Sequence, residues 1–217
     1  LILQRLPYTL MLTGAALLIE YIIAIPLGLL AAVKKNSAAD KSLTVMTIVL
    51  WSMPPFWLGV LFILTFSVWL KILPISGWDG FASLILPAFT LALPALAQIF
   101  RLTRSEVLDV LDEKYVTTAY AKGLKNKVVL VKHVLRNAMI PVITYVGPMT
   151  AYILTGSMVV ETVFTVGGLG TKFVSSINNQ DYPMIMATTI FLATLMVLAT
   201  LLSDLVYKLV DPKITFE

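Results

Sequence analysis

Five long stretches with almost no charged residue restrict what this chain can fold into. The stretch from about Leu43 to Leu70 contains no charge at all. A run of roughly 20 apolar residues is long enough to cross the hydrocarbon core of a bilayer. The five stretches predict membrane spans at about 8–33, 43–70, 83–100, 138–160 and 182–207.

The composition also favours a membrane protein. Charged residues make up 13% of the chain, and the mean hydropathy is +0.91, whereas a soluble domain carries about 25% charged residues. Lipid cannot satisfy backbone N–H and C=O groups, and the runs are too long and too continuously apolar for barrel strands. We therefore predict an all-α bundle of transmembrane helices, forming a single domain over residues 1–217. Kinks are expected at the internal prolines, which are Pro26, Pro54, Pro55, Pro87, Pro94, Pro141 and Pro148.

Lysine and arginine are distributed unevenly between the predicted spans. Only Arg5, Lys71 and Lys172 fall outside three segments, which lie between spans one and two, between spans three and four, and after span five. Cytoplasmic segments of membrane proteins carry an excess of these residues. The asymmetry predicts that the three basic segments and the C-terminus lie in the cytoplasm. Their basic residues are Lys34, Lys35, Lys41, Arg101, Arg104, Lys114, Lys122, Lys125, Lys127, Lys132, Arg136, Lys208 and Lys213.

The connection at about 101–137 is the one long segment on the predicted cytoplasmic side. It begins with helical spacing, which Gly123 is expected to end, and a second helical pattern follows. An ordered loop with small residues at its tip is typical of a docking surface; a basic loop without a partner is the alternative. The residues spaced by three and four are Val107, Leu108, Leu111, Tyr115 and Ala119, and those on the charged face are Asp109, Asp112, Glu113 and Lys114.

Residues 113–123 read EKYVTTAYAKG. The segment resembles the EAA loop, the cytoplasmic coupling loop of permease subunits of ATP-binding-cassette importers. That loop has Glu-Ala-Ala, three residues, Gly, nine residues and Ile-x-Leu-Pro. Thr117-Thr118-Ala119 stands for Glu-Ala-Ala and Gly123 fits. The second half departs from the pattern, with His133, Leu135 and Arg136 in the places of Ile, Leu and Pro.

The sequence is more closely similar to the oligopeptide/dipeptide/nickel-type branch of these permeases. Loops of that branch read much like YVTTAYAKGL followed by KHVLRNAMIPVIT. VVETVFTVGGLG at 159–170 and DLVYKLVDPKI at 204–214 resemble two further segments of the branch, although Gly167 stands where Pro is usual. The resemblance covers essentially all 217 residues.

The resemblance implies the type I permease fold of ABC importers and a role as half of a translocation pore. It implies one more helix before this fragment, hence six spans, and the opening at Leu1 without Met also suggests an upstream part. The implied partners are a second homologous permease subunit, two ATPase subunits and an extracytoplasmic solute-binding protein, in a bacterial or archaeal cytoplasmic membrane. The implied coupling residues are Glu113, Tyr115, Thr117, Thr118, Ala119, Ala121, Lys122 and Gly123.

The chain is not predicted to be an enzyme, and no cofactor, metal site or nucleic-acid partner is expected. It has no G-x-x-x-x-G-K-[ST] phosphate loop. The nearest segment, 167–173, lacks that ending and is expected to be a glycine-rich turn on the outer side. An intramembrane protease would need a Ser–His pair or two acids in the bilayer, and the single His133 is cytoplasmic. An ion-coupled secondary transporter remains the alternative of a different class, although no internal repeat is evident.

Glu20 is the one acid deep inside a predicted span, roughly 17 Å from its start. Such residues usually face a bundle interior or a water-filled path. Two interpretations stay open: Glu20 lines the translocation route, or it is a protonated or hydrogen-bonded packing residue. His133 is predicted to be structural, because one His without Cys cannot form a conventional zinc site. The group Asp204, Tyr207 and Asp211 is predicted to be a solvated helix end, or to pair with Lys208 or Arg136.

The cargo that the resemblance favours is a short peptide, the commonest substrate of such permeases. Nickel or another chelated metal is the alternative. The spans contain no set of His, Cys or paired acids that would hold a bare metal, but a chelate recognised by the binding protein would not need one.

Overall fold

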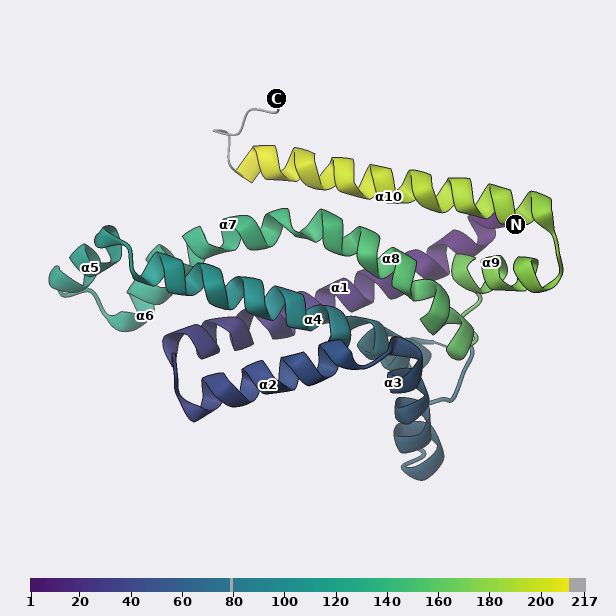
Figure 1. The fold of residues 1–217 in the computed structure, drawn as a ribbon, viewed down its shortest axis with the longest axis horizontal. Helices are drawn as coiled ribbons and strands as arrows, with labels where there is room; N and C mark the ends of the chain where they lie inside the picture. Colours follow the sequence, from purple (N-terminus) through teal and green to yellow (C-terminus); the bar gives the residue numbers. More distant parts are fainter. Residues whose placement is uncertain (79, 211–217) are drawn as a thin grey trace.

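The computed structural model is a bundle of helices, most of which run along one long axis (Figure 1). It describes residues 1–78 and 80–210, with their side chains except at 203, 204 and 206–210. No strand occurs in this described part, which agrees with the predicted fold class. The elements are α1 (Ile2–Val33), α2 (Ala38–Ser52), α3 (Pro55–Phe62), the π-helix η1 (Ile63–Trp69), α4 (Phe81–Leu111), α5 (Lys114–Ala121), α6 (Asn126–Val128), the π-helix η2 (Val129–Leu135), α7 (Arg136–Thr144), α8 (Val146–Val163), α9 (Leu169–Asn178) and α10 (Tyr182–Val210).

Three helices are each long and apolar enough to cross a bilayer: α1, α4 and α10. Two bent pairs pass the same test, α2 with α3–η1 and the helices of 126–144 with α8. Counting each pair as one span gives up to five membrane spans. The exact limits of the spans remain predictions.

The sequence suggested that the apolar run at 43–70 forms one span with a kink. In the structure, the run divides into two helical parts with different directions. The chain bends by 102° between α2 and α3–η1. Met53 takes an extended conformation, as expected for the residue before a proline, and Pro54 and Pro55 begin the new helix. In contrast, α1 and α4 continue through Pro26, Pro87 and Pro94. A second bend, of 47°, lies at Tyr145 between α7 and α8.

The predicted third span and the start of the predicted loop form one helix. Helix α4 continues without a break from Phe81 to Leu111 and ends at Asp112. The sequence pattern suggested that helical spacing from Ser105 runs on to the glycine, but Glu113 is extended and starts a separate helix, α5. The first part of the predicted 101–137 connection is therefore helical and continuous with α4, and its role as a coupling loop stays a prediction.

The main core lies between α1 and α4. The face of α1 turned to the core has a buried residue at nearly every fourth position: Leu12, Ala16, Glu20, Ala24 and Gly28. Small residues allow membrane helices to approach closely. A Cβ atom on Gly28 would lie 2.8 Å from the Thr103 Cβ and 3.0 Å from the Phe100 carbonyl oxygen. Gly28 therefore sets the distance between the two helices.

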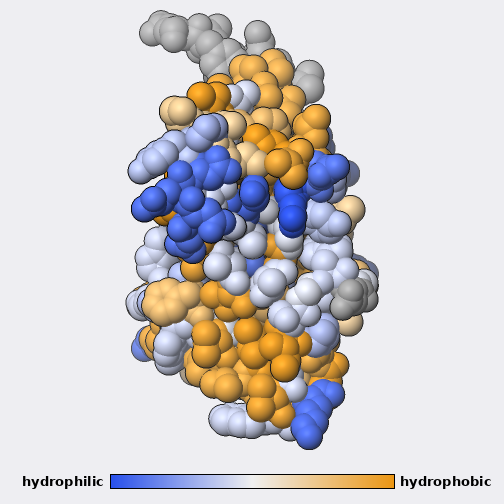
Figure 2. Space-filling model, turned by 90° about the vertical axis from the view of Figure 1, so that its right-hand side faces the viewer, coloured by the Kyte–Doolittle hydropathy of each residue, from blue (hydrophilic) through white to orange (hydrophobic). Residues whose placement is uncertain are grey.

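The two ends of the bundle carry different structures. Helices α5 and α6 lie at one end, and α9 lies at the other, beside the N-terminus (Figure 1). Seen from the α9 end, hydrophilic surface gathers across the middle, between hydrophobic areas above and below it (Figure 2). We call the α5 end the inner end and the α9 end the outer end.

Candidate functional site

Residues 113–128, which contain the predicted coupling residues and which we call the coupling hairpin, project from the inner end of the bundle (Figure 1). Gly123 has a φ of 76°, the left-handed conformation that favours glycine. Its N–H donates to the Tyr120 carbonyl at 2.9 Å, and the Leu124 N–H donates to the Ala119 carbonyl at 3.3 Å. These bonds close the end of α5 and confirm the predicted helix stop at Gly123.

The inward face of α5 consists of Val116 and Ala119, which are 1% and 5% exposed. They pack into an apolar group that we call the inner cluster. The prediction placed Tyr115 with Ala119 on this face, because it assumed one uninterrupted helix. The break at Asp112 and Glu113 changes the register, so that Val116 faces inward instead. The cluster also contains Ala32 of α1, Val107 of α4, Val129 and Val134 of η2, and Ala138 of α7.

Ala119 is the one predicted coupling residue that is buried. Its small side chain lets α5 lie against the bundle, and a contact of Ala119 with a partner subunit stays a prediction. The other predicted coupling residues are exposed. The outward surface of the hairpin comprises Glu113, Lys114, Tyr115, Thr117, Thr118, Ala121, Lys122 and Gly123.

Hydrogen bonds of two tyrosines hold the hairpin: one joins it to α7, and the other lies within it. The Tyr115 hydroxyl accepts a hydrogen bond from Asn137 Nδ2 at 2.7 Å, and the Tyr120 hydroxyl donates to Asn126 Oδ1 at 2.8 Å. Both tyrosines are 41% exposed. Sequence reasoning did not single out Tyr120, Asn126 or Asn137, because no local pattern pairs them.

An ion pair joins α2 to the inner part of α4. Arg104 Nε lies 2.7 Å from Asp40 Oδ1, and Arg104 Nη2 lies 2.8 Å from Asp40 Oδ2. Asp40 Oδ2 also accepts a hydrogen bond from the Asn36 N–H, and the Ser37 hydroxyl caps α2. Paired bonds of this kind fix geometry as well as charge. The sequence showed Arg104 only as one basic residue among many and did not single out Asp40.

Glu20 is fully buried on the face of α1 that packs against the core. Neither carboxylate oxygen has a hydrogen-bond partner among the described residues. An unpaired charge at such a site is costly. Glu20 therefore does not line an open path in this conformation, and a pore-lining role would require α1 to separate from its neighbours.

A buried carboxylate that sequence reasoning missed organises the outer end. Glu161, at the end of α8, accepts hydrogen bonds from the Thr9 hydroxyl at 2.7 Å, the Gly170 N–H at 2.7 Å and the Thr171 N–H at 3.2 Å. The Leu169 N–H donates to the Thr9 hydroxyl oxygen at 2.9 Å. The predicted glycine-rich turn is thus the start of α9, whose free N–H groups bind Glu161.

The glycines of this outer turn leave room for Glu161. A Cβ atom on Gly168 would collide with the Glu161 carboxylate, and one on Gly170 would collide with the Met158 backbone. The sequence does contain a signal for the Glu161 site, namely an acid at the end of an apolar run that is followed by a glycine-rich segment.

The remaining predicted residues form no further site. The His133 carbonyl accepts a hydrogen bond from Asn137. The described residues contain no group of three or more His, Cys, Asp or Glu side chains that could hold a metal ion. The predicted group of Asp204, Tyr207, Lys208 and Asp211 lies outside the described side chains, as does most of the segment 204–214.

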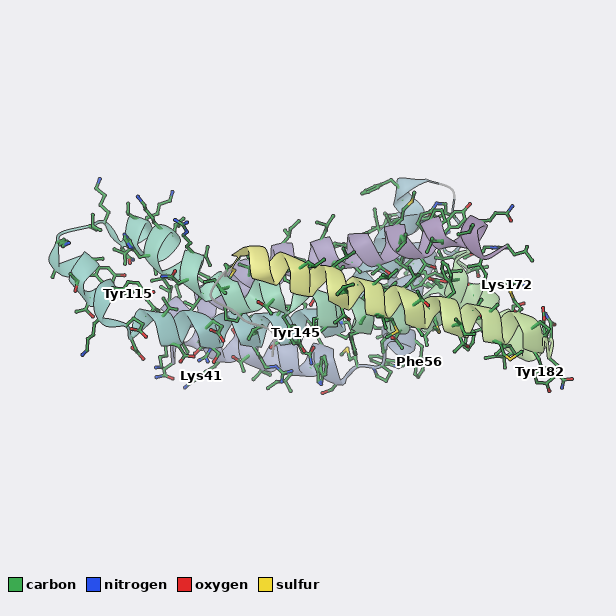
Figure 3. All side chains as sticks on the ribbon, turned by 90° about the horizontal axis from the view of Figure 1, so that it is seen from above. Lys41, Phe56, Tyr115, Tyr145, Lys172 and Tyr182 are labelled. Atoms are coloured by element: carbon green, nitrogen blue, oxygen red, sulfur yellow. The ribbon has the colours of Figure 1, made fainter. Side chains whose placement is uncertain are left out.

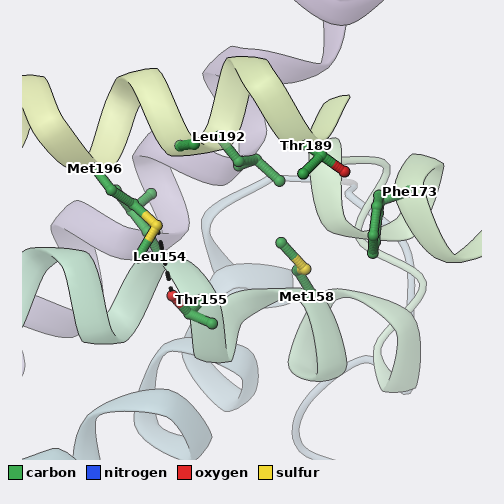
Figure 4. Close-up of a pocket in the computed structure, with 8 residues that line it drawn as sticks. Leu154, Thr155, Met158, Phe173, Thr189, Leu192 and Met196 are labelled. Carbon is green, nitrogen blue, oxygen red and sulfur yellow. Dashed lines mark hydrogen bonds between the residues drawn. The ribbon is translucent and has the colours of Figure 1, made fainter. Parts of the chain in front are cut away.

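A cavity of about 230 Å³ lies between α8, α9 and α10 (Figure 4). Its wall is apolar except for two threonines, and the Thr155 hydroxyl contacts the Met196 sulfur at 3.8 Å. The cavity has no charged group that could hold the ends of a polar cargo. Its lining residues are Leu154, Thr155, Met158, Phe173, Thr189, Leu192, Ala193 and Met196.

Known proteins similar to this chain are transport permeases. The oligopeptide transport system permease protein AppB of Bacillus subtilis is 42% identical, over 100% of this chain and 72% of AppB. The dipeptide transport system permease protein DppB of the same organism is 43% identical, over 92% of this chain and 65% of the relative. DppB of Lactococcus lactis is 38% identical, over 99% and 71%.

Solved structures show the same fold. A chain of the MetNI methionine ABC transporter in an inward facing conformation matches with a TM-score of 0.80 at 17% identity, covering 97% of this chain and 96% of that one. A chain of an amino acid ABC transporter matches with a TM-score of 0.67 at 17% identity, covering 98% and 94%. These matches confirm the predicted all-α permease fold of ABC importers. Residues 24–216 match the family model described as binding-protein-dependent transport system inner membrane component, and the chain belongs to this family of membrane-embedded transport permeases.

Proposed function

We propose that this chain is one of two permease subunits of a peptide importer and forms half of its pore. The relatives named above are permeases for oligopeptides and dipeptides, which favours short peptides over nickel or another metal chelate as cargo. The observation that carries the proposal is the coupling hairpin. A short helix is anchored by its inward face and presents an outward face of polar and small side chains, as a docking element requires.

The hairpin transmits movement from two separate ATPase subunits, and the chain itself catalyses no reaction. When the ATPases close, they displace α5. The inner cluster packs α5 against the ends of α1, α4 and η2, so a displacement of α5 moves those helices as well. The Asp40–Arg104 ion pair carries the movement to α2. ATP therefore biases the pore between two arrangements through contacts that differ between them.

The basic inner end lies in the cytoplasm, and the outer end faces an extracytoplasmic solute-binding protein. Helix α10 starts at the outer end and runs towards the inner end (Figure 1), which supports a cytoplasmic C-terminus. The membrane is the cytoplasmic membrane of a bacterium or an archaeon. Glu20 contacts the cargo only in an arrangement in which α1 has moved.

Site-directed cross-linking tests this function, because the chain has no cysteine of its own. In the assembled importer, Thr118→Cys on the outward face of α5 should form a cross-link with an ATPase subunit. Asn178→Cys, exposed at the outer end, is the matched control and should form none. The proposal fails if Thr118→Cys does not cross-link to the ATPase, or if uptake into vesicles persists without nucleotide.

A further inference from the structure

Polar side chains gather on one face of the bundle, midway between its ends. Gln98, Arg101, Leu102 and Tyr145 line a cavity of about 360 Å³. Gln98 and Arg101 lie on α4, and Tyr145 lies at the bend between α7 and α8. Tyr145 is near the middle of the long axis, far from both Tyr115 and Lys172 (Figure 3). The cavity therefore lies midway along the bundle, away from both of its ends.

The groups around this cavity are held in a defined arrangement. The Tyr145 hydroxyl donates to Gln98 Oε1 at 3.3 Å. The Arg101 guanidinium lies 5.6 Å from the centre of the Trp51 ring, which stacks on Tyr152 at 6.2 Å. Trp51 is 37% exposed and Tyr152 is 48% exposed. Three helical segments thus contribute to one polar and aromatic surface.

Lipid does not account for this surface. Polar and charged groups are costly when they face hydrocarbon, and in membrane proteins they usually line a water-filled cavity. Arg101 Nε donates to the Ala97 carbonyl, and no acid pairs with Arg101, since Asp40–Arg104 is the one ion pair in the described part of the chain. The terminal nitrogens of Arg101 can therefore grip a carboxylate, for which the planar guanidinium is suited.

We propose that Gln98, Arg101 and Tyr145 form a contact site on the translocation path for the C-terminal carboxylate of a peptide. Arg101 binds the carboxylate, and the side-chain amide of Gln98 forms hydrogen bonds with the last peptide groups of the cargo. Trp51 and Tyr152 offer an aromatic surface to the side chains of the cargo. This inference rests on the proposed function and names the part of the cargo that the chain recognises.

Uptake of two matched peptides tests the site. One peptide has a free C-terminal carboxylate and the other a C-terminal amide, and both are first verified to bind the solute-binding protein. Uptake of each peptide is measured in proteoliposomes that contain the complete importer. The solute-binding protein is loaded with the peptide and added at a saturating concentration. Arg101→Gln should lower uptake of the free acid roughly tenfold or more, the scale of a charge-assisted hydrogen bond, and leave uptake of the amide unchanged.

Two further variants sharpen the result. Arg136→Gln removes an exposed charge on the same side, outside the cavity, and should change neither uptake. Gln98→Leu leaves the charges intact. It should lower uptake of both peptides, because both contain the peptide groups to which the Gln98 side chain forms hydrogen bonds. Equal loss of both peptides in Arg101→Gln, or no loss in that variant, overturns the inference. Absence of ATP-dependent uptake by the wild-type importer would instead overturn the proposed function.

Discussion

The outer turn and the coupling hairpin are attached to the bundle in different ways. At the outer turn, Glu161 accepts three hydrogen bonds, two of them buried, that join α1, α8 and the start of α9. At the hairpin, Val116 and Ala119 contribute apolar contacts. Among the described residues, the half-exposed Tyr115 hydroxyl bonds Asn137 of α7, and the half-exposed Tyr120 hydroxyl bonds Asn126 within the hairpin. Hydrogen bonds require a narrow geometry, whereas apolar contact is non-directional. The outer end is thus built to stay assembled, and the inner end can change its tilt while it remains packed.

Replacing the buried carboxylate should have the largest effect on stability. Glu161→Ala leaves the Thr9 hydroxyl and two backbone N–H groups without their acceptor, at a cost of about 3 kcal/mol or more. Thermal unfolding of the purified permease in detergent should shift down by roughly 6–12 °C. Asp109→Asn, at an exposed position, is the control and should leave the midpoint in place. An unchanged midpoint in Glu161→Ala would remove the contrast between the two ends.

A glycine pair on α1 tests the packing that joins the two ends. Gly28→Ala places a Cβ against Phe100 and Thr103 and should cost about 1–3 kcal/mol. Gly14→Ala on the same helix meets no atom within 4 Å, so it should be neutral or gain up to about 1 kcal/mol from helix propensity. Unfolding midpoints in detergent compare the two variants. Equal midpoints would show that α1 and α4 are not in this close contact.

The ion pair between α2 and α4 should matter more for transport than for stability. Asp40→Asn should cost only about 1 kcal/mol, because Arg104 is partly exposed. Peptide uptake per ATP hydrolysed should nevertheless fall, since α2 no longer follows α4. The double variant Asp40→Arg with Arg104→Asp should recover part of the lost uptake. Lys41→Gln, the exposed neighbour, serves as control; a loss in Lys41→Gln equal to that in Asp40→Asn would argue against the pair.

The smallest effect is expected at the tyrosines of the hairpin. Tyr115→Phe removes one hydrogen bond at a half-exposed position and should cost about 0.5–1 kcal/mol. Amide hydrogen exchange in α5 should become faster, while exchange in α9 stays unchanged. A slower or identical rate in α5 would mean that the inner cluster alone holds the hairpin.

The structural features that could be predicted from the sequence are those that depend on local pattern. The charge-free runs identified the membrane helices, and Gly123 marked the end of α5 through its conformation. Pro54 and Pro55 indicated a kink, but the size of a bend depends on what the two halves pack against, which no single sequence states. The break at Asp112 and Glu113 carries no proline or glycine, and for this reason the register of α5 was predicted wrongly.

Contacts between distant segments could not be predicted. Thr9 and Glu161 are 152 residues apart, and Asp40 and Arg104 are 64 residues apart. Periodicity shows which face of a helix is apolar, but it does not show which polar residues of two helices meet. Both pairs were therefore missed.

Uptake of peptide per ATP hydrolysed, measured for Val116→Ala in the reconstituted importer, tests the central claim most directly. The variant loosens the inner cluster and leaves the outward face of α5 intact, so the ATPases should still dock and hydrolyse ATP while the uptake per ATP falls several-fold. Val131→Ala, an exposed position in the same loop region, should keep the wild-type ratio. A wild-type ratio in Val116→Ala would contradict the claim that the inner cluster transmits the movement of α5 to the pore.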